Sequence, residues 1–324
     1  MNLDYIVDAA RAVSLPLRGH AAKETLQRYL MTQLQNDGLL VDVAFIGGTA
    51  LRFLHQLPRY SEDLDFIWKN PTNEAALDKW SKTLTRALTK LGVVAHVQAK
   101  RAEKEDAKVR KRFFVVYLLA EAPAFKAFTS HGLQISFEID LDPPSHTEGE
   151  VKTLAIAGNQ VTVPTLNLPS LMAGKLHILL TRKDREKGRD WFDYAWYLRA
   201  GILPNVPQLQ SAIAQTSDGP EARFWMSYLR ERTKTVNWQN VRNDVKPFLE
   251  DPAAADRLNE VSISHLTPYP DFPALMTELH ELELKHPILT AENPVWADIE
   301  SAALEGIEEA IECRSLIADL EKKV

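Results

Sequence analysis

The chain has 324 residues, of which 45% are hydrophobic and 25% are charged, with 13 glycines and 18 prolines; this excludes collagen-like, low-complexity and largely disordered proteins. At about 150 residues per domain, the length predicts about two domains. The 38 Lys and Arg residues against 44 Asp and Glu residues give a net charge of −6, which argues against non-specific coating of nucleic acid but allows a local basic patch.

Apolar spacing in the first half of the chain predicts helices and strands in alternation. Helices are predicted over 21–36, 49–57 and 73–91, and strands over 41–46, 64–68, 93–98, 112–119 and 133–141. The first helix is expected to end at Asp37 and Gly38. This order favours a mixed sheet with helices packed on it.

The second half is almost wholly helical in its pattern. Helical spacing extends over 170–182, 189–200, 206–215, 220–234, 238–250, 273–284 and 295–323, whereas the Ser- and Pro-rich residues 259–273 predict a loop. We therefore predict an α+β fold with a core domain over 1–165 and an all-helical domain over 166–324. The boundary is expected within 160–170.

The single cysteine, Cys313, excludes an intrachain disulfide and a Cys-based zinc site, and it fits a reducing cytoplasm. The longest apolar runs, such as 113–120, are far shorter than the ~18 residues of a membrane span. The N-terminus is acidic and lacks the basic-then-apolar order of a signal peptide. We expect a cytoplasmic globular protein with no membrane contact.

The most informative motif follows the predicted strand 41–46. Gly47 and Gly48 have no Cβ and allow a ligand to approach the main chain. Thr49 begins the next helix, where its hydroxyl can cap the helix or contact a phosphate, and the free amides and helix dipole favour a triphosphate. Taken alone, the motif is also compatible with a tight turn that binds nothing.

Asp63 and Asp65 follow the glycine turn, and this combination is much rarer than an isolated Asp-x-Asp. On a strand they point to the same face, and two adjacent carboxylates repel each other unless a cation bridges them. Mg²⁺ commonly takes one or two carboxylates together with substrate phosphates. The alternating Leu64, Phe66 and Trp68 predict that the opposite face is buried. The alternative for an isolated Asp-x-Asp is a solvated strand end.

A second charged segment lies at residues 171–193. Lys175 is on a predicted helix and can reach phosphates as a point charge. Asp190 and Asp193 are three residues apart on the next helix and share a face. The alternative for Lys175 is an ordinary surface lysine. Asp190 is alternatively an acid at a helix N-terminus or a partner of Arg189 or Arg182, and Asp193 a residue that only holds Arg182 or Lys175 in place.

The run IGGTALRFLHQLPRYSEDLDF, residues 46–66, resembles the nucleotidyltransferase superfamily and, more narrowly, the AbiEii/AbiGii (MenT-like) toxins. The resemblance continues in LMAGKLHILLTR, residues 171–182, and GRDWFD, residues 188–193. It covers about residues 40–70 and 165–200. The roles that it implies are phosphate binding by Gly47, Gly48, Thr49 and Lys175, binding of one or two Mg²⁺ ions by Asp63 and Asp65, and catalytic roles for Lys175 and Asp190.

The resemblance also implies a third carboxylate on a neighbouring strand. Glu138, Asp140 and Asp142 alternate with apolar residues, so they share one face. Glu138 is the first candidate and Asp140 the second, as a metal ligand or a base; the alternative is a solvated acidic edge. Further supporting candidates in or beside the motifs are Arg52, Arg59, Ser61, Asp140 and Asp193.

Two basic segments are candidates for RNA contact, since Lys and Arg neutralise phosphates in sequence-independent binding. Residues 100–112 hold seven basic and three acidic residues and predict a loop or hairpin projecting from the sheet. Residues 182–189 form a second basic cluster beside Lys175. The candidate RNA-binding residues are Arg110, Lys111, Arg112, Arg182 and Lys183. The alternative is a solvated charged turn.

The expected reaction is Mg²⁺-dependent transfer of a nucleoside monophosphate from an NTP to an acceptor hydroxyl. The resemblance implies the 3′ end of tRNA as acceptor, growth arrest, a cognate antitoxin protein and a role in phage defence. The alternatives are transfer to a protein or to a small molecule such as an antibiotic, and a catalytically inactive nucleotide-binding module.

Overall fold

The structure is a computed structural model of the chain. It describes residues 2–69, 74–92, 95–102, 111–118, 133–182, 185–216, 219–281 and 293–321. Two of the predicted RNA-binding residues, Arg110 and Lys183, lie outside these ranges. All the described strands end by residue 166, and the described elements after it are helical, so the α+β class predicted from the sequence is confirmed.

A seven-stranded mixed sheet forms the first half of the chain. Its strands are β1 (Val43–Ile46), β2 (Asp63–Trp68), β3 (Ala95–Ala102), β4 (Lys111–Leu118), β5 (Gln134–Asp140), β6 (Gly149–Ile156) and β7 (Asn159–Leu166). They are arranged in the order β3-β4-β5-β2-β1-β7-β6. The central strand β2 is antiparallel to β1 and parallel to β5, so the strands with the predicted acidic residues are neighbours.

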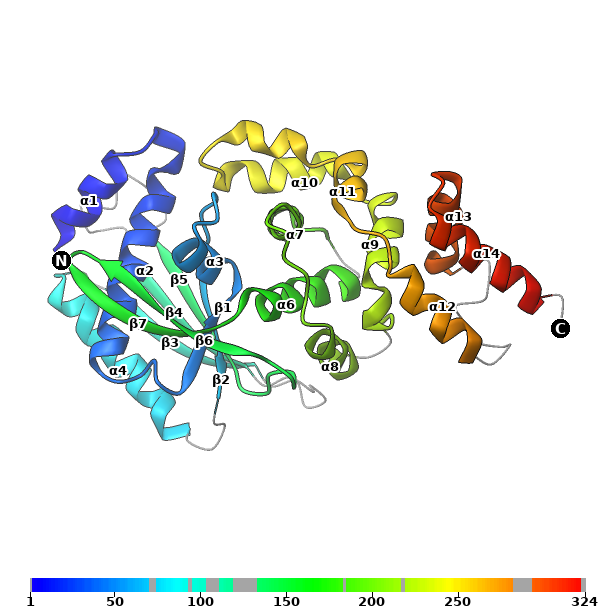
Figure 1. Cartoon of the computed structure of the whole chain (residues 1–324). Helices are drawn as coiled ribbons and strands as arrows, with labels where there is room; N and C mark the ends of the chain where they lie inside the picture. Colours follow the sequence, from blue (N-terminus) through cyan, green and yellow to red (C-terminus); the bar gives the residue numbers. More distant parts are fainter. Residues whose placement is uncertain are drawn as a thin grey trace.

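Helices α2 (Arg18–Asn36) and α4 (Glu74–Lys90) contribute to the core on one face of this sheet. Leu64, Phe66 and Trp68 of β2 are buried in that core, as the alternation of apolar residues predicted. Helix α1 (Leu3–Arg11) packs beside α2, and α3 (Gly47–His55) connects β1 to β2 (Figure 1).

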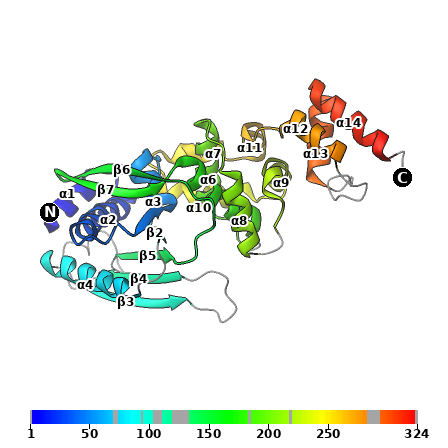
Figure 2. The same ribbon diagram turned by 60° about the horizontal axis from the view of Figure 1, so that its bottom comes forward.

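The second half of the chain is built from helices. Its described α-helices are α6 (Leu168–Thr181), α7 (Gly188–Arg199), α8 (Val206–Thr216), α9 (Trp225–Thr233), α10 (Trp238–Val245), α11 (Glu260–Leu266), α12 (Phe272–Glu281), α13 (Pro294–Leu304) and α14 (Glu308–Glu321). The 3₁₀ turns of this half are η2 (Ala222–Phe224), η3 (Lys246–Phe248) and η4 (Pro252–Arg257), and a further one, η1 (Leu15–Leu17), precedes α2. Figures 1 and 2 show α12, α13 and α14 at the end of the molecule farthest from the N-terminus.

A second core joins the sheet to these helices. Ala44 of β1, Leu51 of α3 and Ile67 of β2 are buried with apolar residues of α6 and α7. Because side chains alternate along a strand, the odd-numbered residues of β2 share the face of Ile67. Asp63 and Asp65 therefore lie on the face of the sheet that the helical half covers.

The β6–β7 hairpin was not predicted. Strand β6 forms one edge of the sheet; Val151 near its start is 65% exposed, whereas Leu154 and Ile156 near its end are buried. The hairpin turn contains Ala157 and Gly158, both with positive φ.

Two predictions for the helical half were wrong. Residues 259–273 were predicted as a loop, but α11 lies within them; the Asn259 side chain accepts a hydrogen bond from the Ser262 N–H and caps its N-terminus. The single helix predicted over 295–323 is two helices. Gly306 adopts φ +85°, a conformation that ends α13 and turns the chain into α14.

Within the described residues, no helix combines the length and the apolar character that crossing a bilayer requires.

Candidate active site

The two aspartates of β2 share a face of the sheet with a third carboxylate, on the neighbouring strand β5. Asp65 is in register with Glu138 of β5, and Asp63 is in register with Ser136. Registered residues on adjacent strands point to the same face, so Asp63, Asp65 and Glu138 share one surface. Asp140 is one step further along, in register with Ile67. The register thus brings Glu138, rather than Asp140, beside the Asp-x-Asp pair.

The environment of Asp63 raises the pKa of its carboxyl above the ordinary value. Desolvation by the surrounding protein and the neighbouring Glu62 raise the pKa of the Asp63 carboxyl, while Lys23, a hydrogen bond with the Ser136 side chain and Arg189 oppose the shift. A bound cation would reverse this balance, because it favours the ionised carboxylate.

The glycine turn lies directly against Asp65. Gly47 adopts φ +75°, and a Cβ on it would overlap the Asp65 carboxylate. A Cβ on Gly48 would overlap the Arg59 guanidinium and lie 3.1 Å from the Ser61 hydroxyl. Both positions therefore need glycine: the first for its backbone conformation and the second for the space.

The Thr49 hydroxyl neither caps the helix nor is free to donate to a phosphate, the two roles that its position suggested. Its side chain is fully buried, and its hydroxyl donates a hydrogen bond to the main-chain carbonyl of Asp63. The residue before α3 is Ile46, which provides no side-chain cap. The Thr49 hydroxyl thus ties α3 to β2, and the N-terminal amides of α3 are left for another partner.

Lys175 lies in a buried network of charges. Its Nζ is 3.1 Å from Asp190 Oδ1 and 2.9 Å from Asp193 Oδ2. Arg59 binds both oxygens of Asp193 through Nε and Nη2, each at 2.6 Å. Arg182 Nη1 is 2.8 Å from Asp190 Oδ2. The pairing of Asp190 with Arg182 and of Asp193 with Lys175 are two of the alternatives that the sequence left open.

The network carries a positive balance, because three cations face two carboxylates. Burial alone would lower the pKa of Lys175, but Asp193 and Asp190 raise it above its ordinary value. Burial would likewise raise the pKa of Asp190, but Lys175 and Arg182 lower it. The lysine is therefore held charged and the aspartate ionised.

Glu62, Arg189 and Lys23 belong to the same region and were not predicted as site residues. Arg189 Nη1 is 2.7 Å from Glu62 Oε2, and Lys23 Nζ is 3.8 Å from Glu62 Oε1. The Gln27 side chain donates a hydrogen bond to the Glu62 main-chain carbonyl at 2.8 Å. The only sequence signal for Glu62 is its position next to Asp63, since its partners are far away along the chain.

The remaining predicted residues lie around this site. Arg52 pairs with Glu24 at 2.9 Å and Glu250 at 2.7 Å, and so it anchors α3. Lys111 and Arg112 begin β4, which is antiparallel to β3, and residues 103–110, which hold most of the predicted loop or hairpin, lie outside the described residues.

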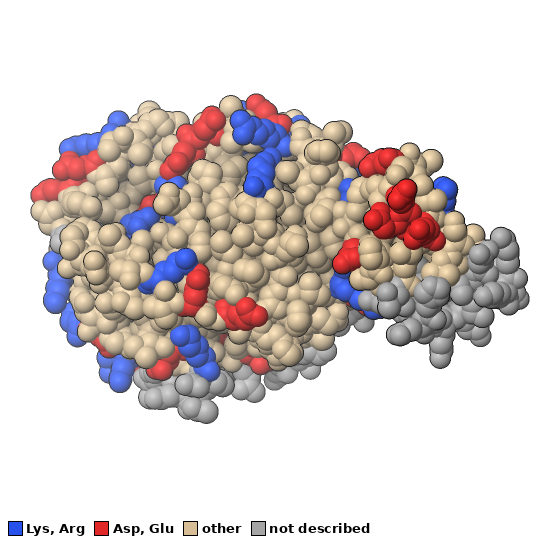
Figure 3. All heavy atoms as spheres, in the orientation of Figure 1, with Lys and Arg blue, Asp and Glu red and all other residues tan. Residues whose placement is uncertain are grey.

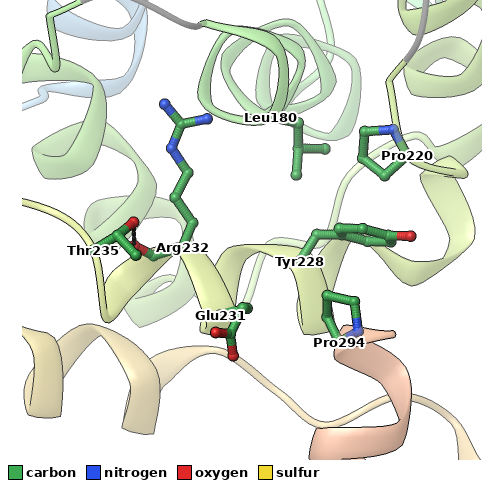
Figure 4. Close-up of a pocket in the computed structure, with 7 residues that line it drawn as sticks. All are labelled: Leu180, Pro220, Tyr228, Glu231, Arg232, Thr235 and Pro294. Atoms are coloured by element: carbon green, nitrogen blue, oxygen red, sulfur yellow. Dashed lines mark hydrogen bonds between the residues drawn. The ribbon is translucent and has the colours of Figure 1, made fainter. Parts of the chain in front are cut away.

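A separate hollow of about 270 Å³ lies between α6, α9 and α13 (Figure 4). It is lined by Leu180, Pro220, Tyr228, Glu231, Arg232, Thr235 and Pro294. The predicted site residues do not line it. Arg232 at its edge donates a hydrogen bond to the Arg182 main-chain carbonyl at 2.8 Å, which fixes the end of α6.

The donor chemistry on β2 suits a hard cation such as Mg²⁺. Among the described residues, no cluster of three or more His, Cys, Asp or Glu side chains is arranged to hold a metal ion. Two carboxylates are nevertheless the usual protein share of a Mg²⁺ site in which substrate phosphates supply other ligands. The residues present therefore fit a metal that arrives with, or is completed by, a nucleotide.

A family model described as nucleotidyl transferase AbiEii toxin, type IV TA system, matches residues 28–276. The match covers more than half of the chain and includes the glycine turn, both aspartates of β2 and the Lys175 network, so the chain is a nucleotidyltransferase. It belongs to the AbiEii family of toxins from type IV toxin–antitoxin systems. Membership implies an NTP substrate and a cognate antitoxin.

Two solved structures from Helicobacter pylori are similar to the chain. The protein JHP933 is 17% identical over 81% of this chain and 95% of its own, with a TM-score of 0.43. A second chain, described as a proposed nucleotidyltransferase, is 16% identical over 81% of this chain and 96% of its own, also with a TM-score of 0.43. No curated protein matches the chain.

Proposed function

We propose that this toxin transfers a nucleoside monophosphate from an NTP to the 3′ end of tRNA, with one or two Mg²⁺ ions, and thereby arrests growth. The observation that supports the site is the contact between the glycine turn and Asp65, on the face that also carries Asp63 and Glu138. A phosphate at this turn would lie next to metal-binding carboxylates. We also propose that residues 1–165 form a core domain and that residues 166–324 form a helical domain, which contributes Lys175 and Asp190 to the site.

In this proposal the triphosphate is bound mainly by the main chain. Gly47 and Gly48 allow close approach, and the uncapped amides at the start of α3 offer donors for phosphate oxygens. Thr49 would contribute its main-chain N–H, because its hydroxyl is already bonded to Asp63. Lys175 supplies a charged ammonium from the neighbouring helical half, and the net positive charge of its network suits an anion.

Asp63 and Asp65 are the residues that would hold Mg²⁺, which when bound would neutralise phosphate charge and stabilise the attacking and leaving oxygens. The acceptor hydroxyl attacks the α-phosphorus, a new P–O bond forms, the bond to the β-phosphate breaks and pyrophosphate leaves. The fold then acts mainly by positioning and electrostatics, as is usual for phosphoryl transfer.

Glu138 is the better candidate to accept the proton from the acceptor hydroxyl. Asp190 is bound by both Lys175 and Arg182, and the lowered pKa of Asp190 makes it a weak base. Glu138 lies in register with Asp65 on the shared face. We therefore assign proton transfer to Glu138 and the orientation of Lys175 to Asp190.

An RNA acceptor is supported by the position of the basic hairpin. Lys111, at the start of β4, is in register with Asp140 of β5, and Phe113 is in register with Glu138. The basic end of the hairpin is thus one strand away from the proposed base. Lys and Arg residues of this segment would neutralise RNA phosphates in sequence-independent binding. Since NTPs and tRNA share the cytoplasm, we expect the protein to act there.

The acceptor is tested by incubating the purified protein with Mg²⁺ and each labelled NTP in turn, with and without total cellular RNA. We expect label at the 3′ end of RNA of tRNA size, dependent on Mg²⁺ and absent with Asp63→Ala. Label that appears only in protein or in small molecules would contradict the tRNA acceptor. Label that appears equally after chelation of Mg²⁺ would contradict the metal requirement.

A further inference from the structure

The loop between α3 and β2 connects the two halves of the molecule. The Tyr60 N–H donates a hydrogen bond to the Phe248 carbonyl at 2.8 Å, and Arg59 forms an isolated β-bridge with Leu249. Glu62 pairs with Arg189 of α7 at 2.7 Å. The loop that leads into the Asp-x-Asp strand is thus bound at several points to the helical half, which carries Lys175.

Arg59 makes the most buried of these connections. Its side chain is 2% exposed, and its guanidinium binds Asp193 through two bonds of 2.6 Å. Nη1 donates a third hydrogen bond to the Tyr60 carbonyl at 2.9 Å. Nη2 also occupies the space that a Cβ on Gly48 would need. One planar group therefore contacts both the glycine turn and Asp193.

Asp193 links Arg59 to Lys175, because one of its carboxylate oxygens contacts both cations. The Asp193 side chain is fully buried, and its Oδ2 atom is 2.6 Å from Arg59 Nη2 and 2.9 Å from Lys175 Nζ. A carboxylate fixed by a two-bond fork has little freedom to rotate. The direction of the Lys175 ammonium therefore depends, through the Asp193 carboxylate, on the Arg59 guanidinium, which lies against Gly48.

We propose that Arg59 is a positioning residue for nucleotidyl transfer: through Asp193 it sets the Lys175 ammonium relative to the glycine turn. The inference rests on the proposed contact between Lys175 and the triphosphate. A buried ion pair seldom adds much net stability, because desolvation offsets the attraction. What the arginine supplies is a rigid, planar pair of donors, which a lysine at the same position does not provide.

The test measures binding of a non-reacting NTP analogue, with a methylene group between the α- and β-phosphates, and of the free nucleoside, both with Mg²⁺. We expect Arg59→Lys to weaken binding of the analogue about tenfold, equivalent to about 1.4 kcal/mol, and to leave nucleoside binding unchanged. A loss of folding alone would weaken both ligands equally. Unchanged binding of the analogue would overturn the positioning role.

Arg230→Lys is the matched control, because Arg230 also lies in a buried pair, with Asp298 at 2.8 Å, but joins α9 to α13. It should lower stability about as much as Arg59→Lys while leaving both affinities unchanged. Should Arg59→Lys fail to fold, Asp193→Asn serves the same comparison, since it keeps the shape of the side chain but removes the charge shared by Arg59 and Lys175.

A double-mutant cycle with Lys175→Ala separates positioning from an independent effect. If Arg59 acts through Lys175, Arg59→Lys should add less than about twofold to the loss already caused by Lys175→Ala. Losses that multiply would overturn the inference while leaving the phosphate contact of Lys175 intact. Unchanged analogue binding in Lys175→Ala would overturn that contact and the inference with it. Because the assay contains no RNA, neither outcome depends on the identity of the acceptor.

Discussion

Asp193 receives hydrogen bonds from two cations that come from different parts of the chain, Arg59 before β2 and Lys175 on α6. Asp190 does the same for Lys175 and Arg182. In this network each carboxylate is paired with two cations, and removal of one carboxylate leaves its cations buried with less compensation. Single residues at this site therefore have effects on stability and on binding that must be measured separately.

Asp65→Asn separates metal binding from folding. An amide is a weaker ligand than a carboxylate for a hard cation, so we expect incorporation of labelled nucleotide to fall by at least about a hundredfold. The substitution preserves shape, and the far-UV circular dichroism should match that of the wild type. Asp8→Asn, an exposed carboxylate on α1, is the control and should keep full activity. Wild-type activity of Asp65→Asn would contradict the metal-binding assignment.

Asp190 gives a pH dependence of known sign. Its pKa is lower in the folded protein than in the unfolded chain, so it stabilises the fold above the unfolded pKa, about 3.9. This contribution should be lost progressively as the pH falls below about 4. Urea unfolding at a series of acidic pH values should show a steeper fall for the wild type than for Asp190→Asn. Equal slopes would mean that Asp190 is not held ionised by Lys175 and Arg182.

At the scale of elements, alternation predicted the burial of β2 correctly, and helical spacing predicted α2, α4 and α6 through α9 to within a few residues. Leu64, Phe66 and Trp68 enter one core and Ile67 the other, which is why the aspartates face the helical half. The β6–β7 hairpin and α11 were missed; β6 is an edge strand with an exposed Val151, and α11 is a short helix whose start is set by the Asn259 cap. The spacing of apolar residues therefore predicts a helix or strand best where one face of that element is buried along its whole length.

Two glycines of the motif regions should respond oppositely to alanine. A Cβ on Gly48 would collide with Arg59 and Ser61, whereas a Cβ on Gly174, within α6, meets nothing within 4 Å. We expect Gly48→Ala to lower both the free energy of unfolding and NTP affinity. Gly174→Ala should raise the free energy of unfolding by about 0.5–1 kcal/mol and leave affinity unchanged. Urea unfolding and analogue binding provide both measurements; a harmless Gly48→Ala would contradict the close packing of this turn.

At the scale of the whole molecule, the net charge is unevenly distributed. Residues 293–324 contain eight acidic and three basic residues, and so account for five of the six net negative charges of the chain. Acidic side chains gather over the C-terminal helices in Figure 3. The rest of the chain is nearly neutral, so its acidic total does not oppose an RNA acceptor at the sheet.

Expression of the intact protein should arrest growth if the proposed transfer to tRNA occurs in cells. The Asp65→Ala protein, expressed to the same level, should not, because it lacks transfer activity. Colony counts after induction, with immunoblots to match protein levels, make the comparison. Equal arrest by both proteins would show that growth inhibition does not arise from nucleotidyl transfer, whereas rescue by co-expressed antitoxin would agree with the family.

The sequence by itself determined the class of the fold, the strand-turn-helix of Gly47 and Gly48, and the shared face of Asp63 and Asp65, because these depend on spacing within a few residues. Only the tertiary structure decided three contacts: Glu138 lies beside Asp65, the Thr49 hydroxyl donates its hydrogen bond to the Asp63 carbonyl of β2, and Arg59 binds Asp193. These contacts join segments up to 134 residues apart. Strand register and helix packing bring them together, and neither is encoded in the local spacing of side chains.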